Sequence, residues 1–401
     1  MFSSLEKFIK NGYDMIYLAA CALFSKIPNK EILLNMNLRC VYKMAALHSM
    51  QAMTFMALES AVSEDKSILN SIDNDLFSKW KIAKAKAVRN NVLFDEERSK
   101  VIDFMENNGI WYCCLKGIVM QKYYAKLGMR QMCDNDILFD SSKRKALYAF
   151  FAQNDYKTIM YNKGYPDAYF KAPVVNFEMH HSLYTEDTDS KTFNDYYKNV
   201  KDRLEKDDEN NFGFHFSKED FYIHTTTHAY KHYTNGGNGI RSLMDVFAFL
   251  SVEKDLIDFG YIEKELEKLG ISTFEKTVRN LSFKLFSDCN HFKVDNTVLT
   301  AKEKELLEFY LGSGTYGTEK NKIETKVQNL QTDNYSSKSK LAYVFRRIFP
   351  DLNYYKVNHP FLYKTKIFIP VYAVWRVFSR LIVNFKNIKY EIKTLSSKKK
   401  K

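Results

Sequence analysis

Proline and glycine are scarce in this chain, with 6 and 14 among 401 residues. So few breakers exclude collagen-like repeats and argue against long flexible linkers, and they favour helices. The six cysteines form no Cys-x-x-Cys pair, and most lie in apolar runs, where a free thiol behaves as a small hydrophobic group. No convincing secretory signal is present, so a reducing cytoplasm is the expected location.

Two common catalytic motifs are also missing. The sequence contains neither a Gly-x-Ser-x-Gly elbow nor a Walker-type phosphate loop. It therefore offers no support for a serine hydrolase or a P-loop ATPase.

Basic character is missing from most of the chain, although the net charge is +12. Residues 336–401 contain 16 Lys or Arg and two acidic residues, a net charge of +14, which leaves −2 for residues 1–335. A nucleic-acid-binding domain is expected to be basic over its folded body, so nucleic acid is not an expected partner.

The remaining pattern predicts an α+β protein in four parts. These are a helical N-terminal module (1–95), an α/β core with a small mixed sheet (96–190), a helical C-terminal domain (191–335) and a basic amphipathic tail (336–401). Short apolar runs predict strands, and longer periodic runs predict helices. The predicted strands of the core are 110–115, 137–139, 156–161 and 174–184, and its predicted helices are 117–127 and 141–151. Helices are also predicted over 220–233, 240–250, 261–269 and 302–311.

Two carboxylates two residues apart, Asp134 and Asp136, open one of these apolar runs. Side chains alternate along a strand, so both carboxylates are expected on one side. Glu178 lies at the centre of the polar face of strand 174–184, where it can join them. Three such carboxylates can hold two Mg²⁺ ions, or Mn²⁺ instead, and serve as catalytic residues. The alternative for Asp-x-Asp alone is a turn or a solvated strand edge.

Lys116 and Gly117 follow strand 110–115 at a predicted strand-to-helix turn. Glycine permits close approach of a phosphate, and the lysine adds positive charge. Arg130 is a further candidate, because arginine binds phosphate bidentately. Its alternative role is a salt bridge to Asp134 or Asp136.

His224, His228 and His232 recur every four residues and share one face of the predicted helix 220–233. Such a face can form a zinc site, but polar groups that line a cleft are the preferred interpretation. His228 and Lys231, together with His180 on the polar face of strand 174–184, are therefore assigned to nucleotide binding. Arg241 and Asp245 are four residues apart and can simply pair with each other.

In the tail, residues 367–385 are apolar and aromatic but contain Arg376 and Arg380, which argues against a spanning helix. Arg376, Arg380 and Asn384 would form a narrow polar stripe, and four lysines follow at 398–401. This pattern predicts a helix in the interface of an anionic membrane, which would place the protein peripherally on the inner membrane face. The alternative is a helix packed on the body.

Taken as a set, several motifs resemble the bacterial family called uncharacterised nucleotidyltransferases, within the polymerase-β-like nucleotidyltransferase superfamily. The similarity covers roughly residues 30 to 250. The matching motifs are Leu115-Lys116-Gly117, Tyr123-Tyr124, Arg130 through Asp136, Glu178-Met179-His180, Ala46-Leu47-His48 and the helical region from His228 to Asp245. In most members of the superfamily, Gly-Ser or Gly-Gly stands where this chain has Lys116-Gly117.

The resemblance implies a nucleotidyltransferase core flanked by helices, an NTP substrate, and Mg²⁺ that is held by Asp134 and Asp136, with Glu178 as the third ligand. It also implies a link to surface-polysaccharide synthesis, with a sugar, a lipid-linked molecule or another small molecule as acceptor. Two other functions stay open: a glycosyltransferase that uses its Asp-x-Asp for a nucleotide sugar, and a non-catalytic membrane-associated binding protein.

Overall fold

The computed structural model describes residues 4–162, 166–185, 190–292, 298–315, 317, 352, 355 and 359–383. The chain forms two compact units, of which the first comprises residues 1–229 and 239–315 and the second residues 230–238 and 316–401. The division into four parts at residues 95, 190 and 335 stays a prediction. Helix α5 runs through the first of these boundaries.

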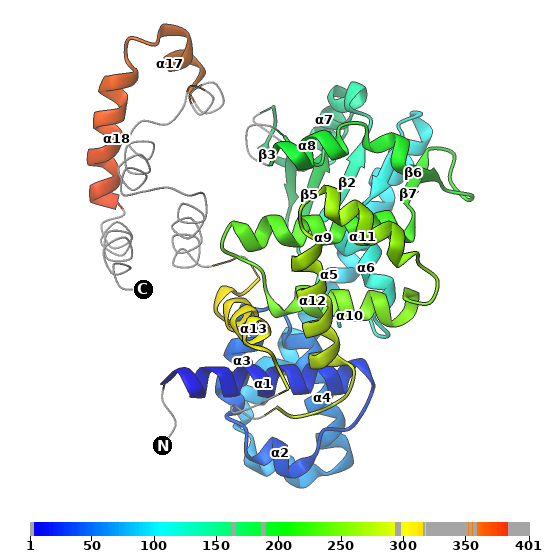
Figure 1. Ribbon diagram of the computed structural model, residues 1–401, viewed down its shortest axis with the longest axis vertical. Helices are drawn as coiled ribbons and strands as arrows, with labels where there is room; N and C mark the ends of the chain where they lie inside the picture. Colours follow the sequence, from blue (N-terminus) through cyan, green and yellow to red (C-terminus); the bar gives the residue numbers. More distant parts are fainter. Residues whose placement is uncertain are drawn as a thin grey trace. The chain divides into compact units, whose positions relative to one another are not determined.

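The N-terminal part of the first unit is helical (Figure 1). Helix α1 is buried on all sides from Gly12 to Ala22, because α3, α4, α12 and α13 pack against it. A Cβ atom on Gly12 would lie 2.6 Å from Leu311 on α13, so glycine permits this close packing. The helices here are α1 (Ser4–Leu23), α2 (Lys30–Leu34), α3 (Leu38–Leu47), α4 (Gln51–Glu64), the 3-10 helix η1 (Lys66–Ser71) and α5 (Asn74–Asn107).

A mixed seven-stranded sheet follows, with strand order β3-β4-β5-β2-β1-β7-β6. The pairs β2–β5 and β1–β7 are parallel and the others antiparallel. The α+β fold class predicted from the sequence is therefore confirmed. The strands are β1 (Tyr112–Cys114), β2 (Asn135–Phe139), β3 (Lys157–Met160), β4 (Asp167–Lys171), β5 (Val175–His180), β6 (Leu204–Lys206) and β7 (Gly213–Phe216).

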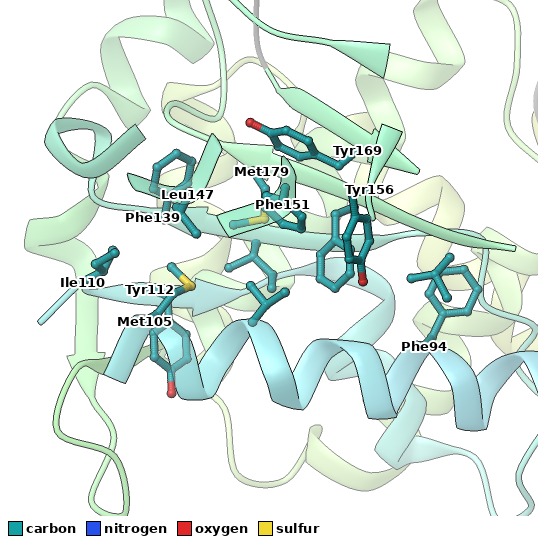
Figure 2. Packing of buried hydrophobic residues seen from close by; sticks show 14 of the residues in the cluster. Phe94, Met105, Ile110, Tyr112, Phe139, Leu147, Phe151, Tyr156, Tyr169 and Met179 are labelled. Carbon is teal, nitrogen blue, oxygen red and sulfur yellow. The ribbon is translucent and has the colours of Figure 1, made fainter. Parts of the chain in front are cut away.

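The core lies between one face of this sheet and the long helix α5 (Figure 2). Asp73 caps the start of α5 by accepting hydrogen bonds from two backbone N–H groups, and Gly109 follows its end with φ +63°. Alternate residues of β2 and β5 point into this core, and α7 (Arg144–Gln153) closes it. The polar residues between them consequently face the opposite side of the sheet. The buried side chains include Phe94, Val101 and Met105 of α5, Ile137 and Phe139 of β2, Phe177 and Met179 of β5, and Leu147 and Phe151 of α7.

The helix predicted over 117–127 is shorter than expected. Helix α6 (Lys116–Met120) passes into the 3-10 helix η2 (Gln121–Tyr123), and Tyr124 is extended. The hydroxyls of Tyr123 and Tyr124 donate to Glu253 and Asp245, at 2.9 and 2.7 Å. These tertiary hydrogen bonds to α10 (Ile240–Glu253) outweigh the local helical pattern.

Helices complete the first unit after the sheet. The glycines at 312, 314 and 317 have the spacing Gly-x-Gly-x-x-Gly, but the first lies in the last turn of a helix, α13, and the set does not follow the strand that a dinucleotide-binding turn requires. The remaining elements are η3 (Ser141–Lys143), α8 (Lys191–Tyr197), η4 (Val200–Arg203), α9 (Lys218–Thr234), α11 (Phe259–Lys268), α12 (Ser272–Phe286) and α13 (Ala301–Ser313).

The second unit contains α17 (Pro360–Thr365) and α18 (Ile369–Val383). Helix α18 lies within the predicted amphipathic segment 367–385. Among the described residues, no helix combines the length and the apolar character needed to cross a membrane. Asn384 of the predicted stripe and the lysines 398–401 lie outside the described residues.

Candidate active site

Strands β2 and β5 bring the predicted carboxylates together. Their parallel register pairs Asp136 with Glu178 and Leu138 with His180. Because Asn135 and Ile137 turn toward α5, Asp136 between them turns to the opposite, polar face. Asp136 is only 3% exposed, whereas the side chain of Glu178 is one-third exposed.

One oxygen of Asp136 is the centre of the cluster. Its Oδ1 accepts from Lys116 Nζ at 2.7 Å and lies 2.8 Å from His180 Nε2. The same His180 nitrogen is 3.9 Å from Glu178 Oε2. Lys116 reaches Asp136 from the first position of α6, two residues after β1, where its backbone is left-handed with φ +45°. Such strain in a non-glycine residue is typical of functional positions.

These side chains have the chemistry of a cation site. Ligand atoms of Asp136, Glu178 and His180 all lie within 4.8 Å of one another in the described part of the chain. Two carboxylates and an imidazole suit Mn²⁺, and the carboxylates suit Mg²⁺. In the structure, the Lys116 ammonium is the positive charge that pairs with the Asp136 carboxylate.

The pKa values reflect crowding of negative charge. Burial raises the pKa of Glu178 to about 7, and the charge of Asp136 adds to the effect. Burial by itself would raise the pKa of Asp136, but the Lys116 ammonium and His180 hold it below its usual range. Burial lowers the pKa of Lys116, yet the carboxylates, Asp136 first, reverse this and raise it. The site therefore gathers more acidic groups than its own cations neutralise.

Asp134 lies just before β2 and is half-buried. Burial, and then the charge of Asp136, raise the pKa of Asp134 to about 6. It is not one of the three residues whose ligand atoms lie within 4.8 Å of one another. Its role as a metal ligand stays a prediction.

Arg130 is held by α10. Its Nε and Nη2 donate to the two carboxylate oxygens of Asp245, both at 2.9 Å. The salt bridge to Asp134 or Asp136 considered from the sequence is therefore wrong, because Asp245 is the partner. Burial lowers the pKa of Arg130, but the carboxylate of Asp245 reverses this and raises it.

Gly117 makes room for this guanidinium. A Cβ atom at Gly117 would lie 2.7 Å from Arg130 Nη1. The absence of a side chain at Gly117 thus serves the packing of Arg130, a role that the Lys-Gly pattern did not reveal. Contact of Gly117 or Arg130 with phosphate stays a prediction.

The pairing of Arg241 with Asp245 is also wrong. Asp245 accepts from Arg130 and Tyr124, whereas Arg241 Nη1 donates to the carbonyl of Gln131 at 2.8 Å. Asp245 is the residue of this site that sequence reasoning missed. It is 115 positions from Arg130, and no local pattern connects the two residues.

The helical histidines are not part of the metal-capable group found among the described residues. His224 is buried and stacks on Phe216 with ring centroids 5.4 Å apart, and its ring is 6.5 Å from that of His228. Neither belongs to the described group of metal-capable side chains. His228 and Lys231 lie on α9, and their part in nucleotide binding stays a prediction.

Comparison with known proteins identifies one family. The model of a family described as uncharacterised nucleotidyltransferase matches residues 35–287, which is more than half of the chain. The matched range contains Lys116, Asp134, Asp136, Glu178 and Asp245. No curated protein and no solved structure matches the sequence.

Proposed function

Because the chain belongs to the family of uncharacterised nucleotidyltransferases, we propose that it transfers a nucleoside monophosphate from an NTP to a hydroxyl or phosphate acceptor. In this reaction an acceptor oxygen bonds to the α-phosphorus, the bond between the α- and β-phosphates breaks, and pyrophosphate leaves. The observation that carries the proposal is the register of β2 and β5, which sets Asp136 beside Glu178 and His180.

Asp134, Asp136 and Glu178 are the groups that would hold Mg²⁺, or Mn²⁺. Such an ion supplies positive charge to the phosphates and the leaving pyrophosphate. The donor set fits this role, because burial raises the pKa values of Glu178 and Asp134, and an added cation would favour their charged forms.

The remaining groups of the site act on the nucleotide and the acceptor. Lys116 provides a fixed ammonium beside the carboxylates, and His180 orients Asp136 through their contact. Glu178 would either hold a metal ion or, where it is free of the metal, accept the proton of an acceptor hydroxyl. The nucleotide-binding set proposed from the sequence is Lys116, Gly117, Arg130, His180, His228 and Lys231.

Calorimetry tests the proposal and names the donor. ATP, CTP, GTP, UTP and UDP-glucose would each be titrated with and without Mg²⁺ into the wild type, Asp136→Asn and Asp103→Asn. Asp103 is exposed on α5 and serves as the matched control. Binding of an NTP that requires Mg²⁺ and is lost only in Asp136→Asn is the expected result.

The other outcomes separate the alternatives. Binding of UDP-glucose without any NTP would overturn the proposal in favour of glycosyl transfer. A wild type that binds no nucleotide would instead favour a non-catalytic binding protein.

We further propose that the acceptor is a sugar or lipid-linked molecule of surface-polysaccharide metabolism and that the tail contacts an anionic membrane. Support for membrane contact comes from exposed apolar side chains just before α18 and in its first half, and from the net charge of +14 over residues 336–401. These side chains are Ile367, Phe368, Val371 and Trp375. Co-sedimentation of the full chain with anionic but not neutral vesicles, weakened by Trp375→Ser, is expected. Equal binding to anionic and neutral vesicles, or binding to neither, would contradict contact with an anionic membrane.

A further inference from the structure

The sequence pattern predicts that Arg130 binds a phosphate, but in the fold its charge is already neutralised by the carboxylate of Asp245. Both oxygens of Asp245 accept from it at 2.9 Å, and Nη1 lies 3.5 Å from the sulfur of Met132. Moving the guanidinium to a ligand would leave Asp245 as a buried charge without its cation. Breaking such a pair is strongly unfavourable.

Arg241, in the first turn of α10, has no such partner. It is half-buried, and none of the ion pairs among the described residues includes it. Its hydrogen bond goes to the backbone carbonyl of Gln131 at 2.8 Å, with the sulfur of Cys133 at 4.0 Å. A partly desolvated guanidinium whose hydrogen bonds go only to neutral acceptors can still form a charged hydrogen bond with an anion.

The position of Arg241 is beside the acidic cluster. It contacts Gln131 and Cys133, which lie three residues and one residue before Asp134. Its charge is also one of those that act on the carboxyl group of Asp134 and oppose the rise in its pKa. An anion bound by Arg241 would consequently lie close to the carboxylates that are proposed to hold the metal.

We propose that Arg241, and not Arg130, is the arginine that binds the polyphosphate of the donor nucleotide. Arg130 is then a positioning residue: it fastens the segment before Asp134 to α10 through Asp245. Asn91 supports the same segment, because it donates to the carbonyl of Arg130 at 3.1 Å and accepts from Met132 N–H at 3.2 Å. This inference rests on the proposed function, since it names the phosphate-binding group of the same site.

The test of Arg241 compares the full-length wild type with Arg241→Met, Arg241→Lys and Arg89→Met. Arg89 is exposed on α5 and is the control for loss of one positive charge. The probes are the four NTPs with Mg²⁺, the matching NMP, and inorganic triphosphate. Arg241→Met should weaken NTP and triphosphate binding about tenfold or more, with a smaller effect on NMP. Arg241→Lys should recover part of the loss, and the melting temperature should stay within a few degrees of wild type.

Inorganic triphosphate separates failure of this inference from failure of the proposed function. If the wild type binds an NTP and Arg241→Met binds it equally well, the inference is overturned while the proposed function stands. If the wild type binds no NTP, the proposed function fails, and loss of triphosphate binding in Arg241→Met would still support the inference. A wild type that binds neither probe would overturn both.

The positioning role of Arg130 has a separate readout. Arg130→Lys keeps the charge but not the bidentate geometry, so Asp134 should be displaced in a protein that still folds. Mn²⁺ affinity, measured well below the melting temperature, should fall about tenfold. Unchanged Mn²⁺ affinity would show that Arg130 contributes to stability alone and would overturn this part of the inference.

Discussion

Asp136 and Asp245 are both buried carboxylates with a basic partner, yet the charge around them is balanced differently. Asp245 receives two hydrogen bonds from Arg130 and one from Tyr124. Asp136 accepts a hydrogen bond from Lys116 and contacts His180, but two further carboxyl groups, those of Glu178 and Asp134, lie near it. One region is a completed ion pair, and the other is a cluster with more acids than cations.

This difference distinguishes an ion pair that stabilises the fold from a cluster that can bind a ligand. A completed bidentate pair has no charge left for a ligand, so it can only position its neighbours. A crowded cluster whose carboxyl pKa values are raised gains free energy when a cation binds, which is the property expected of a functional site. Removing a member of the pair should therefore affect folding, and removing a member of the cluster should affect binding.

The largest expected effect is on the pair. Arg130→Met leaves Asp245 buried without its cation and should lower the free energy of unfolding by about 3–5 kcal/mol. Denaturant unfolding of the full chain measures it, with Arg89→Met as a control expected within about 0.5 kcal/mol of wild type. A loss below about 1 kcal/mol would show that the two regions do not differ as described.

The next effect is on the cluster. Asp136→Asn should lower Mn²⁺ affinity by more than about a hundredfold, because even residues behind metal ligands contribute ten- to a hundredfold. Its stability should change little, since the variant relieves repulsion from Glu178 and Asp134 while it loses Lys116 as a partner. Calorimetry and thermal melting on one preparation check both, beside Asp103→Asn. A large drop in the melting temperature of Asp136→Asn would show that Asp136, like Asp245, is a structural carboxylate.

A smaller effect is expected where the two regions meet. In Gly117→Ala the new methyl would lie 2.7 Å from Arg130 Nη1 and 3.3 Å from the end of Met132. Overpacking of this kind lowers stability by about 1–3 kcal/mol. Because the clash is with Arg130, the loss should shrink in the double variant with Arg130→Ala. Equal losses in both backgrounds would place the strain elsewhere.

The smallest effect is a pH dependence of stability in metal-free protein. The pKa of Glu178 is about 7 because of burial and then the charge of Asp136, so the folded protein retains a proton that the unfolded chain releases near pH 4.5. The contribution of Glu178 to stability is thus greatest at low pH and declines as pH rises toward 7. The melting temperature of wild type minus that of Glu178→Gln should decrease from about pH 5 to 7.5 in EDTA. A flat difference would contradict the raised pKa.

The candidate site could be predicted where its geometry is local. Alternation along 174–184 placed Val175, Phe177 and Met179 on one face and Glu178 and His180 on the other, and β5 has this arrangement. Side-chain direction in a strand follows from the backbone alone, so one sequence is enough to predict it. Strands β4, β6 and β7 were not predicted, and strands of three to five residues contain little periodicity by which to find them.

Non-local partners could not be predicted. The sequence pattern predicted that Arg130 binds a phosphate and that Gly117 lets the phosphate approach closely. In the fold, Gly117 instead lies directly against the Arg130 guanidinium. The helix 117–127 was overextended for the same reason, since the hydroxyls of Tyr123 and Tyr124 bond to carboxylates on α10 more than a hundred positions away.

The sequence by itself determined the α+β class, the family and the polar face that presents Asp136 and Glu178, because composition, motif spacing and the two-residue period of a strand are local properties. Only the tertiary structure decided which charges are already neutralised. Asp245 comes from a distant helix to take Arg130, and Lys116 turns onto Asp136, while Arg241 meets only neutral acceptors among the described residues. The free energy of an ion pair depends on distance and burial, and chain folding brings together charges that no sequence window contains.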